Sequence, residues 1–270
     1  MKNLFSTTIA FAFLTVGSAG AADLSAAPVY KAPVVAPAAF SWTGWYVGVN
    51  AGWAWNDSTD TITAANAAAQ GFVTFSDIAT SLPLSSNGFI GGGQAGYNWQ
   101  VTPMWVLGFE SDIQWADIKK TVSLPGPNDP SRIMTGSEKL DWFGTVRGRV
   151  GVAPWDRSLL YVTGGLAYGQ VNLSTALTRT SGCGGNNCQA GSATETRFGW
   201  TVGAGLEWAF VKDWSFKAEY LHYDLGSISH VMTDPFFPAI FNASADLKGN
   251  IARVGLNYRF GSGGPVVAKY

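Results

Sequence analysis

The chain has 270 residues, of which only 13% are charged and 14% are aromatic, with 33 glycines and 12 tryptophans. This charge content is low for the surface of a soluble protein. The formal net charge is −1 and no basic run stands out, which excludes a nucleic-acid-binding protein.

Residues 1–21 have the pattern of a secretory signal peptide. Lys2 is followed by an apolar stretch from Leu4 to Val16, and Ala19 and Ala21 occupy the cleavage positions. The apolar stretch is shorter than the roughly 20 residues that a membrane helix needs. We therefore expect export, followed by a mobile Ala- and Pro-rich linker over residues 22–40.

Eight segments of 13 to 15 residues then read as strands, which is long enough for a tilted membrane crossing. No later stretch of 18 apolar residues offers a membrane helix, so any insertion must be by strands. The predicted strands are 42–55, 88–101, 105–117, 139–152, 159–173, 197–211, 214–227 and 248–260.

The connections between these segments alternate between long and short. Long loops are predicted at 56–87, 118–138, 174–196 and 228–247, and short turns at 102–104, 153–158 and 212–213. Outer-membrane barrels combine long extracellular loops with short periplasmic turns. An even number of strands then places both chain ends in the periplasm.

Aromatic residues recur at even spacings of eight or ten, so both members of each pair share one strand face. Along a tilted strand this spacing covers roughly 20–25 Å of membrane depth, the height of an apolar band between two aromatic girdles. A β-sandwich core is the alternative, but it does not require this spacing. The pairs are Trp45 and Trp53, Phe89 and Trp99, Trp105 and Trp115, and Trp200 and Trp208.

The last strand carries opposite chemistry on its two faces. Val254, Leu256, Tyr258 and Phe260 share an apolar face with Ala252, and the residues between them are polar. A soluble barrel has an apolar interior, whereas a transmembrane barrel turns its apolar face to lipid. The polar positions of this and the earlier strands predict an inward set: Asn50, Gln94, Asn98, Gln100, Glu110, Asp112, Gln114, Asp141, Thr145, Arg147, Arg149, Glu207, Lys217, Glu219, Arg253, Asn257 and Arg259.

Eight strands enclose a lumen that side chains can fill. We expect the inward charges to neutralise one another in a buried network, which disfavours an open pore. Its predicted members are Glu110, Asp112, Arg147, Arg149, Glu207, Lys217, Glu219, Arg253 and Arg259.

Five segments resemble the small outer-membrane surface antigens of alphaproteobacteria, an opacity-like or porin family that includes hemin-binding proteins. They are DLSAAPVY (23–30), FSWTGWYVGVNAGW (40–53), YVTGGLAYG (161–169), AEYLHYDLG (218–226) and VGLNYRF (254–260). The resemblance implies an all-β, eight-stranded, OmpA-like transmembrane barrel of the Gram-negative outer membrane, spanning residues 41–260.

The resemblance leaves the biochemical role open between an envelope-integrity and surface-interaction protein, a hemin binder and a narrow porin. It implies outer-membrane lipid, lipopolysaccharide, periplasmic chaperones and the barrel-assembly machinery as partners, with hemin or a host-surface ligand as further candidates. Such barrels usually end in an aromatic residue that the assembly machinery reads. Here Tyr258 and Phe260 are the expected signal, followed by a periplasmic tail over residues 261–270, with Tyr270 as the alternative.

Cys183 and Cys188 are the only cysteines and lie in a predicted loop, so in an oxidising compartment we expect a disulfide. His230 and Met232 lie with Phe236, Phe237 and Phe241 in the last predicted loop. Haem iron favours axial His, Met or Tyr, so this loop could hold hemin, although packing onto the barrel rim explains its aromatic residues equally well. We expect no metal site, because two thiols lack the further His or Cys partners that a site needs. We also expect no enzymatic activity, because an eight-stranded lipid A deacylase needs a serine near its histidine, and the residue two after His222 is Asp224.

Overall fold

The computed structural model describes residues 40–183 and 188–260. The predicted signal peptide, most of the linker and the C-terminal tail lie outside the described residues. The strands and the single helix of the described part are β1 (Gly44–Asn56), β2 (Thr59–Ala64), α1 (Ala67–Thr74), β3 (Ser81–Pro83), β4 (Asn87–Gln100), β5 (Trp105–Pro125), β6 (Arg132–Trp155), β7 (Ser158–Arg179), β8 (Gln189–Ala209), β9 (Trp214–Met232) and β10 (Phe241–Arg259).

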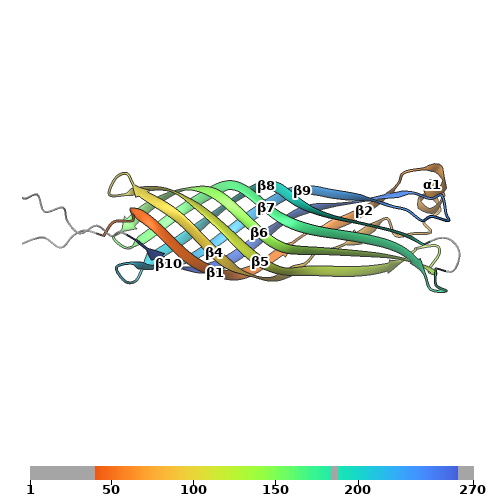
Figure 1. Ribbon diagram of the computed structural model, residues 1–270, viewed down its shortest axis with the longest axis horizontal. Helices are drawn as coiled ribbons and strands as arrows, with labels where there is room; N and C mark the ends of the chain where they lie inside the picture. The colour runs from red at the N-terminus through yellow and green to blue at the C-terminus, as the bar shows by residue number, and fades with distance from the viewer. Residues whose placement is uncertain (1–39, 184–187, 261–270) are drawn as a thin grey trace, which may run out of the picture. The chain divides into compact units, whose positions relative to one another are not determined.

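Eight antiparallel strands form a closed ring, which confirms the predicted transmembrane barrel. β1 and β4 to β10 pair in sequence order, and β10 pairs back onto β1 from Tyr46 opposite Arg259 to Asn56 opposite Gly249. Figure 1 shows these strands tilted around a common axis. No described helix is long and apolar enough to cross a membrane.

The faces of the ring follow the predicted alternation. All eight residues of the four aromatic pairs are exposed on the outer surface, with Trp45 and Trp53 at 57% and 50%. On β10, Val254 and Leu256 point outward while Arg253 and Asn257 are buried. An apolar band between aromatic girdles therefore faces lipid, and the polar face turns inward.

Six of the strands are much longer than predicted. β5 to β10 have 19 to 24 residues, so most of the predicted loops 118–138, 174–196 and 228–247 are strand. Beyond the lipid-facing band the alternation inverts: Met134, Leu173 and Leu177 point inward and are buried, whereas Thr121 and Ser174 point outward. Water outside the barrel favours polar residues on the outer face, and the prediction searched only for the opposite pattern.

We call this second part of the barrel, residues 57–86, 117–140, 171–183, 188–196 and 225–248, the extension. The ladder between β8 and β9 ends where Trp200 pairs with Asp224, and the described residues beyond it share only the bridge between Ala190 and Thr233. β2 continues beside β10, and β3 pairs with β2. The extension thus consists of two sheets, β5-β6-β7-β8 and β9-β10-β2-β3.

Helix α1 lies at the end of the extension, as Figure 1 shows. Asn66 caps it, accepting a hydrogen bond from the Ala69 amide at 3.0 Å. Phe72 packs against Phe237 and Phe241, within a buried apolar cluster that also contains Met232. This cluster closes the lumen beneath the helix.

A bulge explains one wrong orientation. The β6 register shifts between Leu140 and Trp142 on both neighbouring strands, which places Asp141 at the bulge. Asp141 was predicted to point inward, but it is half-buried and pairs with the exposed Lys139, whose Nζ lies 2.5 Å from Oδ1. An extra residue in a strand reverses the faces of everything beyond it.

Candidate functional site: the charged lumen

Five strands bring eight charged side chains together inside the ring. A strand that contributes two of them does so with residues two positions apart, because alternate residues of a strand face the same side. All eight are at most 5% exposed. They are Glu110 and Asp112 of β5, Arg147 and Arg149 of β6, Glu207 of β8, Lys217 and Glu219 of β9, and Arg253 of β10.

Arg147 lies at the centre of this cluster. Its Nη2 donates to Glu110 Oε1 at 2.5 Å and to Asp112 Oδ2 at 3.0 Å. Its Nη1 donates to Glu219 Oε1 at 2.9 Å. One guanidinium therefore joins carboxylates of β5 and β9, which are not neighbours in the ring.

Lys217 and Arg253 complete the pairing of these carboxylates. Lys217 Nζ lies 2.8 and 2.9 Å from the two oxygens of Glu110. Arg253 Nη2 lies 2.8 Å from Asp112 Oδ2 and 2.6 Å from Glu219 Oε2. Each carboxylate of this group contacts at least two cations, so its charge is neutralised within the lumen.

Arg149 and Glu207 form a second pair beside the first group. Arg149 Nη2 donates to Glu207 Oε2 at 2.9 Å, and its Nε donates to Asn98 Oδ1 at 2.8 Å. The other oxygen of Glu207 accepts from Ser215 Oγ at 2.6 Å and Asn257 Nδ2 at 2.9 Å. Neutral polar residues thus satisfy Oε1 of Glu207 and the Nε of Arg149, whereas Arg149 Nη1 has no hydrogen-bond partner among the described residues.

Two tyrosines that the sequence analysis missed belong to the same network. Tyr46 donates to Glu110 at 2.8 Å, and Tyr161 donates to Glu219 at 3.0 Å. The Arg149 guanidinium lies 5.1 and 4.9 Å from the two ring centroids. Tyr46 shares its strand face with the predicted inward residue Asn50, and this spacing was the available signal.

The four carboxylates and four cations of the cluster balance one another, and all are buried. Such an arrangement fills space and fixes strands to each other, but it leaves no ionised group free to act as a base or nucleophile. Among residues 40–183 and 188–260 no set of three His, Cys, Asp or Glu side chains is placed to hold a metal ion.

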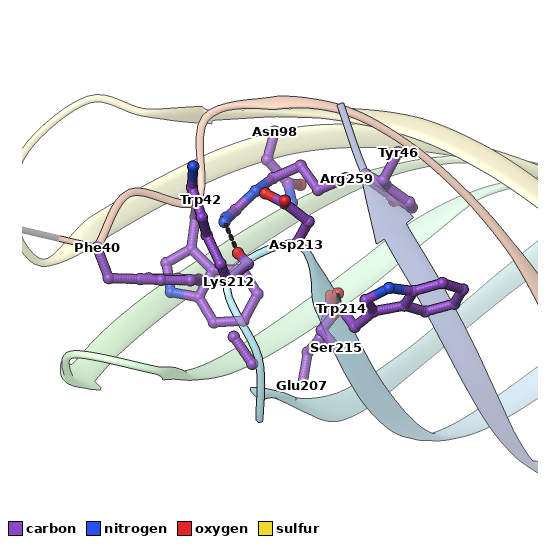
Figure 2. A pocket seen from close by; sticks show the side chains of 11 residues that line it. Phe40, Trp42, Tyr46, Asn98, Glu207, Lys212, Asp213, Trp214, Ser215 and Arg259 are labelled. Carbon is purple, nitrogen blue, oxygen red and sulfur yellow. Dashed lines mark hydrogen bonds between the residues drawn. The ribbon is translucent and has the colours of Figure 1, made fainter. Parts of the chain in front are cut away.

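Arg259 lies apart from the cluster to which the sequence assigned it. It sits at the mouth where the described chain begins and ends, and donates to the Lys212 carbonyl at 2.9 Å (Figure 2). It also donates to the Ser41 carbonyl. Its guanidinium lies 4.5 Å from the ring centroid of Phe40, a residue assigned to the linker. Trp42 is buried beside them, and the cavity that remains is only about 10 Å³.

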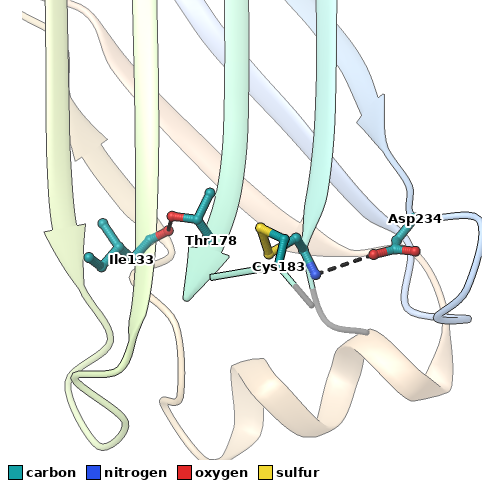
Figure 3. Close-up of a disulfide and its surroundings, with 5 residues drawn as sticks. Ile133, Thr178, Cys183 and Asp234 are labelled. Carbon is teal, nitrogen blue, oxygen red and sulfur yellow. Dashed lines mark hydrogen bonds between the residues drawn. A yellow bond between two sulfur atoms is a disulfide. The ribbon is translucent and has the colours of Figure 1, made fainter. Parts of the chain in front are cut away.

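Cys183 and Cys188 form a disulfide at the end of the extension (Figure 3). The backbone amide of Cys188 donates to Asp234 Oδ2 at 3.3 Å. Because Asp234 lies between β9 and β10, this contact joins the two sheets of the extension next to the bridge between Ala190 and Thr233.

His230 and Met232 do not lie in an exposed loop, so that part of the hemin prediction is wrong. Both belong to β9 and point into the extension, where His230 is 9% exposed and Met232 is fully buried. Phe241 is buried in the same cluster, whereas Phe236 is exposed. His222 is half-buried in the girdle beside Trp200, with Nδ1 2.9 Å from Asn250 Oδ1.

Tyr258 and Phe260 lie at the end of the last strand. Their rings contact each other edge to face, Phe260 is exposed, and its amide donates to the Trp45 carbonyl at 2.7 Å. The role of these two residues as an assembly signal stays a prediction.

A closed ring with a lipid-facing apolar band and a filled polar lumen defines an outer-membrane β-barrel. The sequence matches the family described as "Outer membrane protein beta-barrel domain" over residues 9–260, and the chain belongs to that family.

Similar proteins carry outer-membrane descriptions. The 31 kDa outer-membrane immunogenic protein of Brucella melitensis is 36% identical over 263 residues, covering 96% of this chain and all of the relative. The 22 kDa outer membrane protein of Rhizobium leguminosarum is 31% identical over 171 residues, covering 63% of this chain and 66% of the relative. The crystal structure of OprG from Pseudomonas aeruginosa covers 82% of this chain and 98% of its own, with 11% identity and a TM-score of 0.47.

Proposed function

We propose that this outer-membrane surface barrel is a non-conducting structural protein that supports the cell envelope and displays its extension outside the cell. The observation that carries the proposal is the charge-balanced cluster in the lumen. Eight buried ionised groups joined by salt bridges of 2.5 to 3.0 Å occupy the cross-section that a solute would need.

Apolar residues fill the lumen beyond this cluster. Phe143, Leu221 and Tyr223 belong to a buried cluster that reaches from the ring into the extension. A second apolar cluster around Phe72 lies at the far end. A water-filled path would have to displace charged and apolar layers in turn, so we do not favour the porin alternative.

The extension supplies the surface role. Its outer face is mainly polar, it ends in α1 and the disulfide, and most of what was predicted as loop between β5 and β10 is paired strand. A polar stem of paired strands would hold the hairpin ends away from the membrane, where they can meet lipopolysaccharide sugars or another surface.

Conductance tests the plugged lumen. Protein reconstituted in a planar bilayer, with folding verified by heat-dependent gel mobility, should give no steady current above that of protein-free bilayers. Large and stable conductance steps would contradict the proposal and favour a porin.

The envelope role needs a cellular test. Cells that lack the protein should become more sensitive to detergents, and the wild-type gene should restore resistance. Unchanged sensitivity in the deletion strain would contradict an envelope role while leaving the conductance result intact.

Hemin binding through His230 and Met232 stays a prediction. Both side chains are buried, so a porphyrin could reach them only if the extension opened. Replacing both by Ala should leave the Soret band and the affinity for hemin unchanged if hemin associates with exposed apolar surface alone. A shifted band would restore the hemin alternative.

A further inference from the structure

Besides Arg132, three buried side chains in the extension have polar atoms without hydrogen-bond partners in the described structure. They are Asp60 of β2, Gln189 of β8 and His230 of β9, with exposed fractions of 0%, 1% and 9%. The partnerless atoms are Asp60 Oδ1, both amide atoms of Gln189 and both ring nitrogens of His230. Buried polar atoms are almost always satisfied, so this concentration indicates an occupant.

These side chains meet around Gly191. The Asp60 carboxylate reaches across the lumen and accepts a hydrogen bond from Thr175 Oγ1 at 2.7 Å. Thr175 is paired with Gly191, and Gln189 lies two residues away on the same strand face. His230 is so close that a Cβ placed on Gly191 would lie 2.6 Å from its Cδ2.

The four residues come from both sheets of the extension. Thr175 and Gln189 belong to the sheet of β5 to β8, and Asp60 and His230 belong to the other. Between β8 and β9 the described strands lack a continuous ladder at this level. An occupant bound by all of them would join the two sheets where backbone pairing does not.

The charge of the site favours a cation. Asp60 is fully buried, and no described Lys or Arg forms a salt bridge with it. The buried acceptors of this set are a carboxylate oxygen, an amide oxygen and an imidazole nitrogen.

We propose that Asp60, Gln189 and His230 form a binding site for a divalent first-row transition-metal ion such as Zn²⁺. His nitrogen and carboxylate oxygen are two of its preferred ligands, the Gln189 carbonyl supplies a weaker third, and water completes the coordination. With only two strong protein ligands, the ion exchanges rather than remaining permanently bound. The incomplete ladder between β8 and β9 is its route inward.

Zinc binding to the folded protein tests the site. Protein stripped with EDTA and then titrated with ZnCl₂ in a calorimeter should bind one ion per chain. His230→Ala and Asp60→Asn should each weaken binding at least tenfold. The matched control is His222→Ala, which removes the only other histidine of the chain, and it should bind as the wild type does.

Several outcomes would overturn the site. The first is that the wild type shows no saturable zinc binding, which would leave water as the occupant. The second is that His230→Ala binds zinc as tightly as the wild type, and the third is that His222→Ala loses binding. Because a variant of a buried residue can fail to fold, X-ray absorption of the zinc-loaded wild type provides a second test. One imidazole with oxygen donors at about 2.0–2.2 Å is expected, and a spectrum without imidazole contradicts the proposal.

Discussion

At the scale of single residues, the lumen cluster derives its strength from the absence of water. Lys217 is fully buried and contacts both oxygens of Glu110, which also binds Arg147 and Tyr46. In such a site the removal of one partner leaves the other charge both buried and uncompensated. The cost of a substitution therefore depends more on the residue left behind than on the residue removed.

We predict that Lys217→Met destabilises the folded barrel by about 3–5 kcal/mol. The matched control is Lys119→Met, because Lys119 is exposed and lies 3.9 Å from Asp117, an arrangement worth less than about 1 kcal/mol. Urea unfolding in lipid vesicles measures both. Adding Glu110→Gln to Lys217→Met should recover part of the loss, and strictly additive effects would show that the two groups do not interact.

Trp42 gives a second prediction at this scale. It is 2% exposed in the mouth of the barrel, and its amide donates to Gln100 Oε1 at 2.8 Å. Trp42→Ala should cost about 3–5 kcal/mol of unfolding free energy, because a large buried ring leaves a cavity. The exposed Trp155 is the control, and an equal loss in Trp155→Ala would contradict a specific role for the mouth.

At the scale of elements, the hairpin ends and the short turns lie at opposite ends of the strands. Pro130 is exposed between β5 and β6, and Asp156 is exposed at the turn between β6 and β7. In a variant without Cys183 and Cys188, we predict that a cysteine at position 130 reacts with a membrane-impermeant label on intact cells, whereas one at position 156 does not. Labelling at 156 alone would invert the predicted orientation.

The sequence was sufficient to predict the ring but not the extension. Alternation with apolar residues outward is unusual enough to indicate lipid, and it correctly placed Glu110, Arg147, Lys217 and Arg253 together inside. In the extension the same two-residue period places apolar residues inward and polar residues outward, as in a soluble protein, and the bulge at Asp141 reverses the faces of β6 between the two parts. A search for apolar residues on the outer face alone therefore ends where the extension begins, and the outer parts of β5 to β10 were predicted as loops.

The candidate site in the ring could be predicted from the sequence, whereas the surroundings of His230 in the extension could not. His230 was identified as a ligand residue, but its burial and its neighbours depend on Asp60 and Thr175, which lie 170 and 55 residues away along the chain. Only the pairing of β2 with β10 brings Asp60 to this level of the lumen. A contact that forms only because β2 pairs with the distant β10 leaves no local pattern in the sequence.

At the scale of the whole molecule, the ring should fold without the β5-β6-β7-β8 sheet of the extension. The pairs that close it, between β1 and β10, lie outside the extension, as do all eight charges of the lumen cluster. We predict that replacing residues 120–138 and 173–193 each by Asn-Gly, which suits a two-residue hairpin turn, leaves a folded barrel. Lys119 pairs with Lys139 and Asn172 with Thr194, so the registers allow both turns.

Heat-dependent gel mobility and circular dichroism measure that outcome. The shortened protein should still migrate faster before heating than after it and should retain a β spectrum. Loss of both signals would show that the ring depends on the β5-β6-β7-β8 sheet of the extension for closure.

The split of the extension into two sheets has a consequence for cooperativity. A closed ring must open along many hydrogen bonds at once, whereas a sheet with a free edge can open one strand at a time. Amide hydrogens of β9 between residues 225 and 232 should therefore exchange with deuterium orders of magnitude faster than those between 215 and 224, which pair on both sides. The molecule would then behave as two units of stability along one continuous set of strands, with its outer half sampling open states while the half in lipid stays closed.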